Sequence, residues 1–273
     1  MSEQVWLDGQ LVDEEVALVP ALGRGWTVGY GVFETLVAHH GTPFALTRHY
    51  QRLEDSAQVV GLAIPALATL RDGCEQVLEA NCRGVPLARL RITIAQGRSE
   101  PVVTITAVPT EPAAATAVVV FSPFRRNPNS ALTGVKTTSY AENTLALAEA
   151  KVRGGDEGLL ANTDGRLCEG TTTNVFVVRS GTLTTPPLSS GCLPGVTRGL
   201  VLEVAAREGI PTVEQDLPCE ALVEAGEAFL TSSTREVQPI ARVDRCPLPV
   251  APGEITRQLQ NAFRDLRERE VDP

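Results

Sequence analysis

Residues 109–115 read PTEPAAA, a stretch rich in proline and alanine that divides the chain into two differently patterned parts. Two β-rich runs precede it, LARLRITIA at 87–95 and VVTITAV at 102–108, and a new apolar run follows it. Proline interrupts helices and sheet ladders, so a stretch of this composition is typical of a linker. The sequence therefore predicts a small domain over residues 1–108, a linker over 109–115 and a larger domain over 116–273.

The part before the linker mixes strands with helices. Residues 5–12 predict a hairpin around an Asp-Gly turn, and the apolar run over 28–38 predicts a further strand. A helix that Thr47 caps and Gly61 ends is expected next, and apolar residues at helical spacing predict another over 65–80. Several strands and two helices in the same part of the chain form an α+β pattern.

The part after the linker alternates strands and helices, which predicts an α/β domain. The expected strands cover residues 118–121, 158–162, 174–178 and 228–231. The expected helices cover 141–153, about 197–208 and a polar segment that begins at Ile255.

The composition describes an ordinary globular protein of 273 residues, 43% hydrophobic and 21% charged. A formal charge of −9 disfavours a nucleic-acid-binding surface. No stretch approaches the ~18 apolar residues of a membrane span. The first residues, MSEQVWLDGQ, lack the apolar segment of a secretion signal, and the six cysteines lack C-x-x-C spacing. We therefore expect a cytoplasmic protein with reduced thiols that binds no metal, nucleic acid or membrane.

Lysine is rare in this chain, because only Lys136 and Lys151 are lysines among the 24 basic residues. Arginine replaces most surface lysines, but it cannot lose its proton and attack a carbonyl carbon as an amine does. Lys136 follows Gly134 in a loop before a helix, and two interpretations are open on position alone. It is either an exposed lysine in a turn, which is the commoner case, or a reactive amine.

Three polar clusters follow the lysine along the chain. Glu169 lies among small polar residues in CEGTTTN at 168–174, which suit the lining of a cavity. LPGVTR at 193–198 precedes a helix whose first N–H groups and Thr197 hydroxyl suit a phosphate, and TSST at 231–234 offers four hydroxyls. Each cluster taken alone also fits a turn, a capped helix start or a strand end. With the lysine they supply what pyridoxal phosphate needs: an amine, an acid for the ring nitrogen and phosphate donors.

Four segments of the chain can be compared as a set: GYGVFETL with RHYQRL, GVKTTSYAENTLALAEA, LCEGTTTNVFVV with TPPLSSGCLPGVTR, and AFLTSSTREVQPI. From about Trp6 to Asp244, their order and spacing resemble the class IV, fold-type IV pyridoxal-phosphate enzymes. That family includes branched-chain and D-amino-acid transaminases and aminodeoxychorismate lyases. The resemblance implies a small N-terminal α+β domain, a larger C-terminal pseudo-barrel domain, pyridoxal 5'-phosphate as cofactor, and a homodimer.

The resemblance also implies roles for single residues. Lys136 is expected to be catalytic, forming a Schiff base with the cofactor and moving a proton at the substrate. Glu169 is expected to pair with the pyridine nitrogen, Leu193 to pack against the ring and Asn174 to order the wall near Glu169. The residues expected to bind the phosphate are Arg52, Val196, Thr197, Ser232 and Ser233. Tyr140 lies one position before a tyrosine that contacts the ring hydroxyl in branched-chain transaminases, so its role is left open.

The substrate site is less constrained by the resemblance. D-amino-acid transaminases of this family use an R-x-H pair for the α-carboxylate, and the corresponding loop here, QGRSEP at 96–101, lacks the histidine. A carboxylate substrate still needs an arginine or a nest of polar groups. The expected substrate-binding residues are Arg91, Arg98, Arg126, Tyr30 and Thr234. Among 22 arginines, a surface ion pair explains each of the three equally well.

Three functions remain as alternatives. The favoured one is a transaminase that moves an amino group between an amino acid and a 2-keto acid, with a D-amino acid as expected substrate and (R)-primary amines as further substrates. The second is an aminodeoxychorismate lyase that forms 4-aminobenzoate and pyruvate. The third is a homologue without cofactor or catalysis, against which the presence of Lys136, Glu169 and the phosphate-binding clusters argues.

Overall fold

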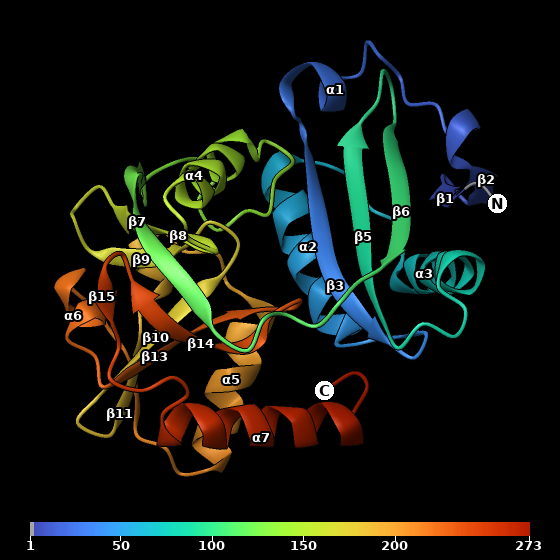
Figure 1. Ribbon diagram of the computed structural model, residues 1–273. Coiled ribbons are helices and arrows are strands. Elements are labelled where there is room, and N and C mark those ends of the chain that lie inside the picture. Colours follow the sequence, from blue (N-terminus) through green and yellow to red (C-terminus); the bar gives the residue numbers. More distant parts are fainter. Residues whose placement is uncertain (1–2) are drawn as a thin grey trace. The chain divides into compact units, whose positions relative to one another are not determined.

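The computed structural model describes residues 3–273, and the chain divides into two units (Figure 1). Unit 1 takes the chain up to Pro112 together with Val135–Tyr140 and Glu270–Pro273. Unit 2 takes the remaining segments, Ala113–Gly134 and Ala141–Arg269. The change of unit after Pro112 falls within the stretch that the sequence marks as a linker. The two short segments that return to unit 1 differ from the predicted division, which has a single linker.

Unit 1 is built on an antiparallel sheet that has six strands within the described residues, in the order β2-β1-β6-β5-β3-β4. Its strands are β1 Gln4–Leu7, β2 Gln10–Asp13, β3 Gly31–His39, β4 Thr42–Pro43, β5 Leu87–Gln96 and β6 Pro101–Pro109. Its helices are the 3-10 turn η1 Glu14–Val16, α1 Arg24–Val28, α2 Leu46–Val60 and α3 Leu67–Asn81. The predicted hairpin is confirmed, since β1 and β2 meet at Asp8 and Gly9, which both have positive φ.

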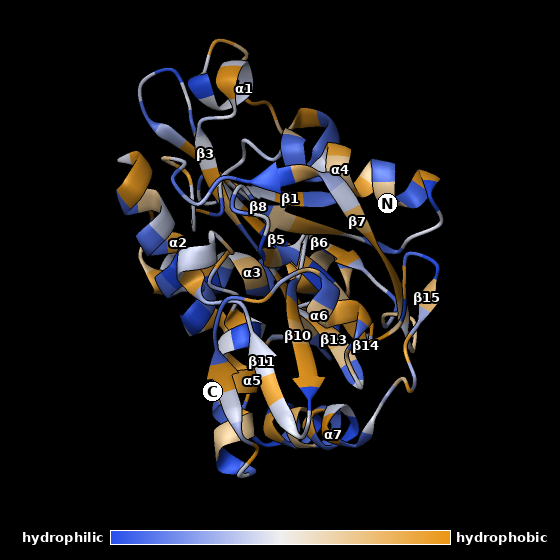
Figure 2. Cartoon of the chain, turned by 90° about the vertical axis from the view of Figure 1, so that its left-hand side faces the viewer, coloured by the Kyte–Doolittle hydropathy of each residue, from blue (hydrophilic) through white to orange (hydrophobic). Residues whose placement is uncertain are grey.

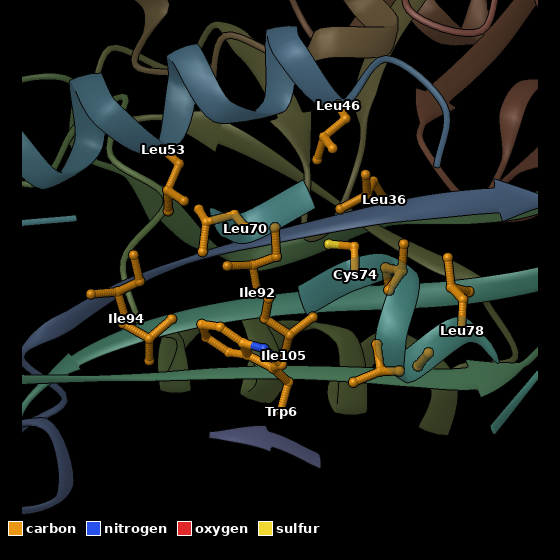
Figure 3. Packing of buried hydrophobic residues seen from close by; sticks show 14 of the residues in the cluster. Trp6, Leu36, Leu46, Leu53, Leu70, Cys74, Leu78, Ile92, Ile94 and Ile105 are labelled. Carbon is orange, nitrogen blue, oxygen red and sulfur yellow. The ribbon is translucent and has the colours of Figure 1, made fainter. Parts of the chain in front are cut away.

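The core of unit 1 lies between one face of this sheet and helices α2 and α3 (Figure 3). Even-numbered residues such as Leu36 and Ile92 point to the core, because side chains alternate along a strand. Leu53 of α2 and Leu70 of α3 pack against them. The odd-numbered residues of β3 and β5 therefore face the other side of the sheet, where Phe33 and Arg91 meet.

Helix α2 begins differently from the prediction. Its N-cap is Ala45, and Thr47 lies in the first turn, so the prediction that Thr47 caps the helix is wrong. The Thr47 amide and hydroxyl instead donate to the Asp272 carboxylate at 2.8 and 2.6 Å. Negative charge is favourable at a helix N-terminus, and these bonds explain why Glu270–Pro273 groups with unit 1. Gly61 ends the helix with a φ of 67°, as predicted.

Unit 2, all of which is described, holds a mixed nine-stranded sheet in the order β12-β11-β10-β13-β14-β7-β8-β9, with β15 paired to β14. The strands are β7 Ala117–Arg126, β8 Glu157–Asn162, β9 Leu167–Gly170, β10 Asn174–Arg179, β11 Thr182–Thr185, β12 Thr212–Glu214, β13 Glu227–Ser232, β14 Glu236–Val243 and β15 Cys246–Pro247. Strand β7 runs parallel to β8 and β14, and β11 runs parallel to β12. The other pairs are antiparallel.

The helices of unit 2 are α4 Ala141–Val152, α5 Val196–Arg207, α6 Glu220–Val223 and α7 Glu254–Arg269, with a 3-10 turn η2 Leu188–Ser190. At the centre of the sheet Phe176 and Phe229 stack with centroids 4.9 Å apart. Strand β10 is hydrophobic along most of its length in Figure 2, in keeping with the burial of its first five residues. Strands β9 and β14 have no predicted counterpart, because charged residues and Pro239 interrupt their patterns. Across residues 3–273, no helix combines the length and apolar character needed to cross a membrane.

Candidate active site

Lys136 lies in unit 1, on a short segment that runs beside the start of β3. The Phe33 amide donates to the Lys136 carbonyl at 2.9 Å, and a β-bridge joins Val32 to Thr137. From α2, the Ser56 hydroxyl accepts a hydrogen bond from the Lys136 amide at 3.3 Å. The backbone is therefore fixed at several points, unlike that of a lysine in a free surface turn.

The Lys136 amine lies beside two aromatic rings. Its Nζ is 4.5 Å from the centroid of the Phe33 ring and 5.7 Å from that of Tyr140, within reach of cation–π attraction. The two rings meet edge to face with centroids 5.1 Å apart. They form a rigid apolar wall beside the amine, and Tyr140, whose role the sequence leaves open, adds a hydroxyl to it.

Arg91 shares this wall with the lysine. Its Cζ lies 3.9 Å from the Phe33 centroid, and its Nε donates to Thr93 Oγ1 at 3.1 Å. Burial lowers the pKa of the Arg91 guanidinium, and the charge of Arg89 adds to this effect. Arginine remains protonated despite such shifts, so Arg91 places a half-buried positive charge on the ring that the amine also contacts.

The other substrate candidates of unit 1 lie elsewhere in the unit. Arg98 is exposed in the turn between β5 and β6. The Tyr30 hydroxyl donates to the Val60 carbonyl at 2.7 Å, and Arg24 lies 4.3 Å above the Tyr30 ring. Tyr30 thus ties the end of α2 to the segment before β3, and its part in substrate binding stays a prediction, as does that of Arg98.

Arg52, which is expected at the phosphate, is bound by a buried carboxylate to which the sequence analysis does not point. Glu34 is fully buried, and its two oxygens accept hydrogen bonds from Arg52 Nε at 2.8 Å and Nη2 at 2.7 Å. His49 Nδ1 lies 2.7 Å from the same carboxylate. His49 and Arg52 are three residues apart on α2 and so share one face of the helix. The isolated acid in the apolar run GVFETLVA is the signal that marks this cluster.

The charges of this cluster balance each other. Burial alone would raise the pKa of the Glu34 carboxyl, but Arg52 and His49 outweigh burial and hold that pKa well below its usual range. Burial lowers the pKa of His49 against the opposing effect of Glu34, so the imidazole is neutral at pH 7 and donates through Nδ1. Glu34 and Arg52 thus form an ion pair that fixes the direction of the guanidinium.

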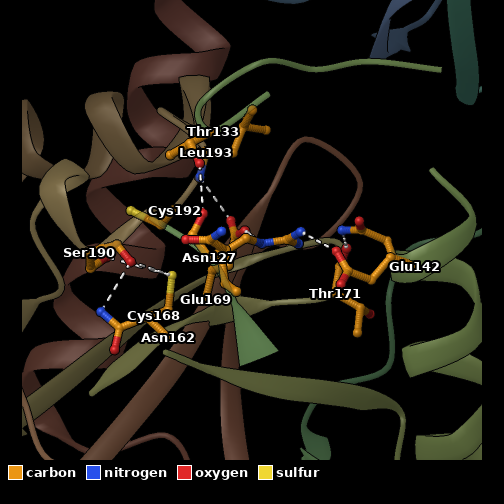
Figure 4. Close-up of polar contacts among 12 residues, drawn as sticks. Asn127, Thr133, Glu142, Asn162, Cys168, Glu169, Thr171, Ser190, Cys192 and Leu193 are labelled. Carbon is orange, nitrogen blue, oxygen red and sulfur yellow. Dashed lines mark hydrogen bonds and ion pairs between the residues drawn. The ribbon is translucent and has the colours of Figure 1, made fainter. Parts of the chain in front are cut away.

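In unit 2, Glu169 lies on β9 with both carboxylate oxygens bonded (Figure 4). Oε2 accepts from the Leu193 amide at 2.9 Å, and Oε1 accepts from Arg126 Nε at 3.0 Å. Arg126 also donates through Nη1 to Glu142 Oε2 at 3.1 Å. Burial would lower the pKa of the Arg126 guanidinium, but Glu169 and Glu142 outweigh it and raise that pKa.

The loop before α5 offers backbone donors. Gly195 is the N-cap of α5 and brings no capping side chain, and no bond from the Val196 or Thr197 amide occurs in the described part of the chain. Asn174 Nδ2 donates to the Leu193 carbonyl at 2.9 Å, which fixes the loop. A Cβ at Gly195 would lie 2.0 Å from Asn174 Oδ1, so this approach requires glycine.

Hydroxyl groups lie at the same end of the sheet. Within residues 3–273, the buried Oγ1 atoms of Thr173 and Thr231 have no hydrogen-bond partner. Thr231 of β13 is paired with Asn174 of β10, which connects these hydroxyls to the loop that Asn174 fixes. The turn after β13 adds Ser232 and Thr234, whose hydroxyl oxygens are 3.4 Å apart, with Ser233 between them. Spare amides at a helix start and spare hydroxyls are donors that suit a phosphate, so these residues fit a phosphate-bearing cofactor.

Comparisons with known proteins show which family this chain is similar to. Residues 31–243 match the family model described as amino-transferase class IV. A branched-chain-amino-acid aminotransferase of Pseudomonas aeruginosa is 32% identical over 286 residues, which cover 96% of this chain and 92% of that protein.

Two solved structures are similar over nearly the whole chain. The branched-chain aminotransferase of Thermoproteus uzoniensis with norvaline has a TM-score of 0.90 and 32% identity, covering 97% of this chain and 95% of that chain. The T.th. branched-chain amino acid aminotransferase with pyridoxamine 5'-phosphate has a TM-score of 0.89 and 26% identity, covering 97% and 94%.

These similarities confirm the fold and the family that the sequence motifs predict. The mixed α/β architecture matches that of fold-type IV aminotransferases. Pyridoxal 5'-phosphate is the cofactor of class IV aminotransferases, in agreement with the expected cofactor. With more than half of its length matched by the family model, this chain belongs to the class IV aminotransferases.

Proposed function

We propose that this aminotransferase moves an amino group between a branched-chain aliphatic amino acid and a 2-keto acid. One observation carries the proposal: the rings of Phe33 and Tyr140 border the Lys136 amine. An apolar wall beside the reacting amine favours an aliphatic side chain, because burying one methylene group contributes about 0.8 kcal/mol. The relatives described above, which are named branched-chain aminotransferases, support the same substrate class.

The cofactor-binding residues are proposed from the donor sets in each unit. When bound, pyridoxal phosphate withdraws electrons from the substrate carbon that loses its proton. Glu169 is proposed to hold a proton at the ring nitrogen, and Leu193 to pack against the ring. The residues proposed for the phosphate are Arg52, the Val196 and Thr197 amides, the Thr197 hydroxyl, Ser232 and Ser233.

The reacting groups of the chain follow from the wall of unit 1. Lys136 Nζ would hold the cofactor at its carbonyl carbon and, as a free amine once the substrate amine has taken its place, would move the proton at the substrate Cα, which an amine can do and a guanidinium cannot. The Phe33 and Tyr140 rings exclude water on one side of the amine. Arg91, stacked on Phe33, is proposed to bind the substrate carboxylate through a charge-assisted hydrogen bond.

A substrate screen tests this function. Enzyme loaded with pyridoxal phosphate is given L- and D-leucine, valine and isoleucine with 2-oxoglutarate, and the branched 2-keto acids are measured by chromatography. We expect their formation in the wild type and its loss in Lys136→Ala. Lys151→Ala is the matched control, because Lys151 is exposed on α4. Conversion of other amino acids but of no branched-chain one would overturn the substrate class.

The same screen, extended to other amino acids, primary (R)-amines and aminodeoxychorismate with detection of pyruvate, decides the finer predictions made from the sequence. Faster reaction of the D-enantiomers, or of a primary (R)-amine, would support the D-amino-acid transaminase. Pyruvate release from aminodeoxychorismate without transfer of its amino group would support the lyase instead and contradict the transaminase.

We also propose a homodimer. Large apolar side chains are exposed in the segment from η1 to α1, with Leu18, Leu22 and Trp26 exposed by 80, 74 and 73%. Clusters of exposed apolar side chains mark interaction surfaces, and twofold dimers are the commonest oligomers. Light scattering measures the assembly, and a monomer with full activity at micromolar concentration would contradict the proposal.

A further inference from the structure

The contacts of Arg126 differ from the role that the sequence suggests for it. Arg126 is a candidate for the substrate carboxylate, yet its guanidinium already bonds two carboxylates of the chain. Nε donates to Glu169 Oε1 at 3.0 Å and Nη1 donates to Glu142 Oε2 at 3.1 Å (Figure 4). Only 16% of the Arg126 side chain is exposed, and only 8% of that of Glu169. A mostly buried ion pair between them is therefore part of the folded unit.

The backbone around Arg126 is built to hold this pair. Arg126 is the last residue of β7, and the register between β7 and β8 shifts between Phe121 and Arg125. Such irregularities redirect the side chains that follow them. Gly191, with a φ of +98°, leaves room for the stem of the arginine, since a Cβ there would lie 3.3 Å from Arg126 Cγ. Both features leave room for the Arg126 side chain to extend to Glu169.

Two buried thiols lie near Glu169, and both are uncharged at neutral pH. Burial raises the pKa of Cys192 to about 11, and it raises that of Cys168 well above the usual range, with the Glu169 charge adding to both. Glu142, on α4, is 59% exposed, so its charge is largely screened by water. Arg126 thus supplies positive charge in direct contact with the Glu169 carboxylate.

We propose that Arg126 is a positioning residue that holds the Glu169 carboxylate ionised and in one orientation, and that it does not bind the substrate carboxylate. This inference rests on the proposed role of Glu169 at the ring nitrogen of the cofactor. A carboxylate fixed by two donors cannot turn away from a third partner without breaking a charge-assisted bond. Loss of Arg126 therefore weakens binding of a cofactor whose ring nitrogen carries a proton.

The test measures cofactor affinity in the protein stripped of cofactor, without any substrate. Equilibrium dialysis gives the dissociation constants of pyridoxal 5'-phosphate and of its 1-deaza analogue, in which a C–H group replaces the ring nitrogen. Arg126→Met is compared with Arg125→Met, because Arg125 is the adjacent and exposed arginine of the same strand. Arg126→Lys keeps the charge with fewer donors, and circular dichroism of every variant reports its folding.

For Arg126→Met we expect pyridoxal phosphate to bind about ten- to a hundredfold more weakly, the effect of one charge-assisted hydrogen bond. Affinity for the deaza analogue is expected to change less than about twofold, since Glu169 has no proton to hold there. Arg126→Lys should fall between Arg126→Met and the wild type, and Arg125→Met should match the wild type. Equal losses for both cofactors would overturn the proposal, because Arg126 would then support only the fold.

A second outcome would also overturn the proposal. Unchanged affinity for pyridoxal phosphate in Arg126→Met, with a raised KM for the keto acid in the loaded enzyme, would assign Arg126 to the substrate. Because the dialysis uses no amino acid, an error in the proposed substrate class leaves its result unaffected. The two failures can therefore be told apart.

Discussion

The buried ion pair between Glu34 and Arg52 leads to a prediction about stability. Replacing Glu34 by Gln keeps the size of the side chain but removes the charge that faces Arg52. Glu34 is fully buried and Arg52 is 10% exposed, so water cannot take the place of the lost partner. Breaking a buried pair by removing one member costs about 3–5 kcal/mol. The amide oxygen of the introduced glutamine can still accept one hydrogen bond, so we expect the free energy of unfolding to fall by about 3 kcal/mol, near the lower limit. That is a large share of the about 5–15 kcal/mol by which native proteins are typically stable.

The effect depends on pH in a definite direction. Arg52 and His49 hold the pKa of Glu34 in the folded protein well below its usual range. A carboxyl group of this kind contributes its stability fully above its unfolded pKa of about 4.3 and loses it as pH falls towards the folded pKa. The difference between wild type and Glu34→Gln should thus be constant from about pH 6 to 8 and shrink below about pH 4.

Urea unfolding followed by circular dichroism measures this difference at pH 7 and at pH 3. Glu54→Gln is the matched control, since Glu54 is exposed on α2 and its replacement should change stability by less than about 0.5 kcal/mol. A loss below about 1 kcal/mol for Glu34→Gln at pH 7 would refute the reasoning. A loss of stability that is equal at the two pH values would also refute the reasoning.

Three further predictions concern catalysis. Lys136→Ala should reduce turnover by at least about a thousandfold. After borohydride reduction, mass spectrometry should find no cofactor attached to the Lys136→Ala protein, whereas Lys151→Ala should turn over and carry attached cofactor like the wild type. Glu169→Gln should bind pyridoxal phosphate at least as weakly as Arg126→Met and, when saturated with it, lose about a hundredfold in kcat, because an amide cannot hold a proton at the ring nitrogen. Unchanged kinetics would show that Glu169 has no such role. Arg91→Ala should raise KM for the keto acid about ten- to a hundredfold while Arg98→Ala changes it less than about twofold, and equal effects would contradict the assignment of Arg91.

Local sequence patterns predict most elements of the fold because they depend on neighbouring residues. The Asp8-Gly9 turn, the apolar run of β3, the alternation along β5 and the glycine after α2 are all visible over a few positions. Thr47 is a residue whose role local patterns do not predict. Its bonding partner, Asp272, is 225 residues away, and no local rule connects a threonine with an acid near the end of the chain.

The candidate site is predicted unevenly for the same reason. The rarity of lysine and the small polar clusters draw attention to Lys136 and Glu169, since these signals lie in residue type and short spacing. The partners of the arginines cannot be read in this way. Glu34 reaches Arg52 from a strand to a helix, and Glu169 reaches Arg126 across β8. In a chain with 22 arginines, the pairing of each one is decided by tertiary packing.

Arg52 and Arg126, which the sequence offers as anion binders, are thus both paired with carboxylates in the folded chain. An arginine paired in this way adds little net charge to a site, because its acid partner cancels most of its field. What the pair does add is direction, since two bonds fix the plane of the Arg52 guanidinium. The proposed phosphate site would therefore need further donors, and the amides at the start of α5 and the hydroxyls of Thr173 and Thr231, unpaired within residues 3–273, are groups suited to supply them.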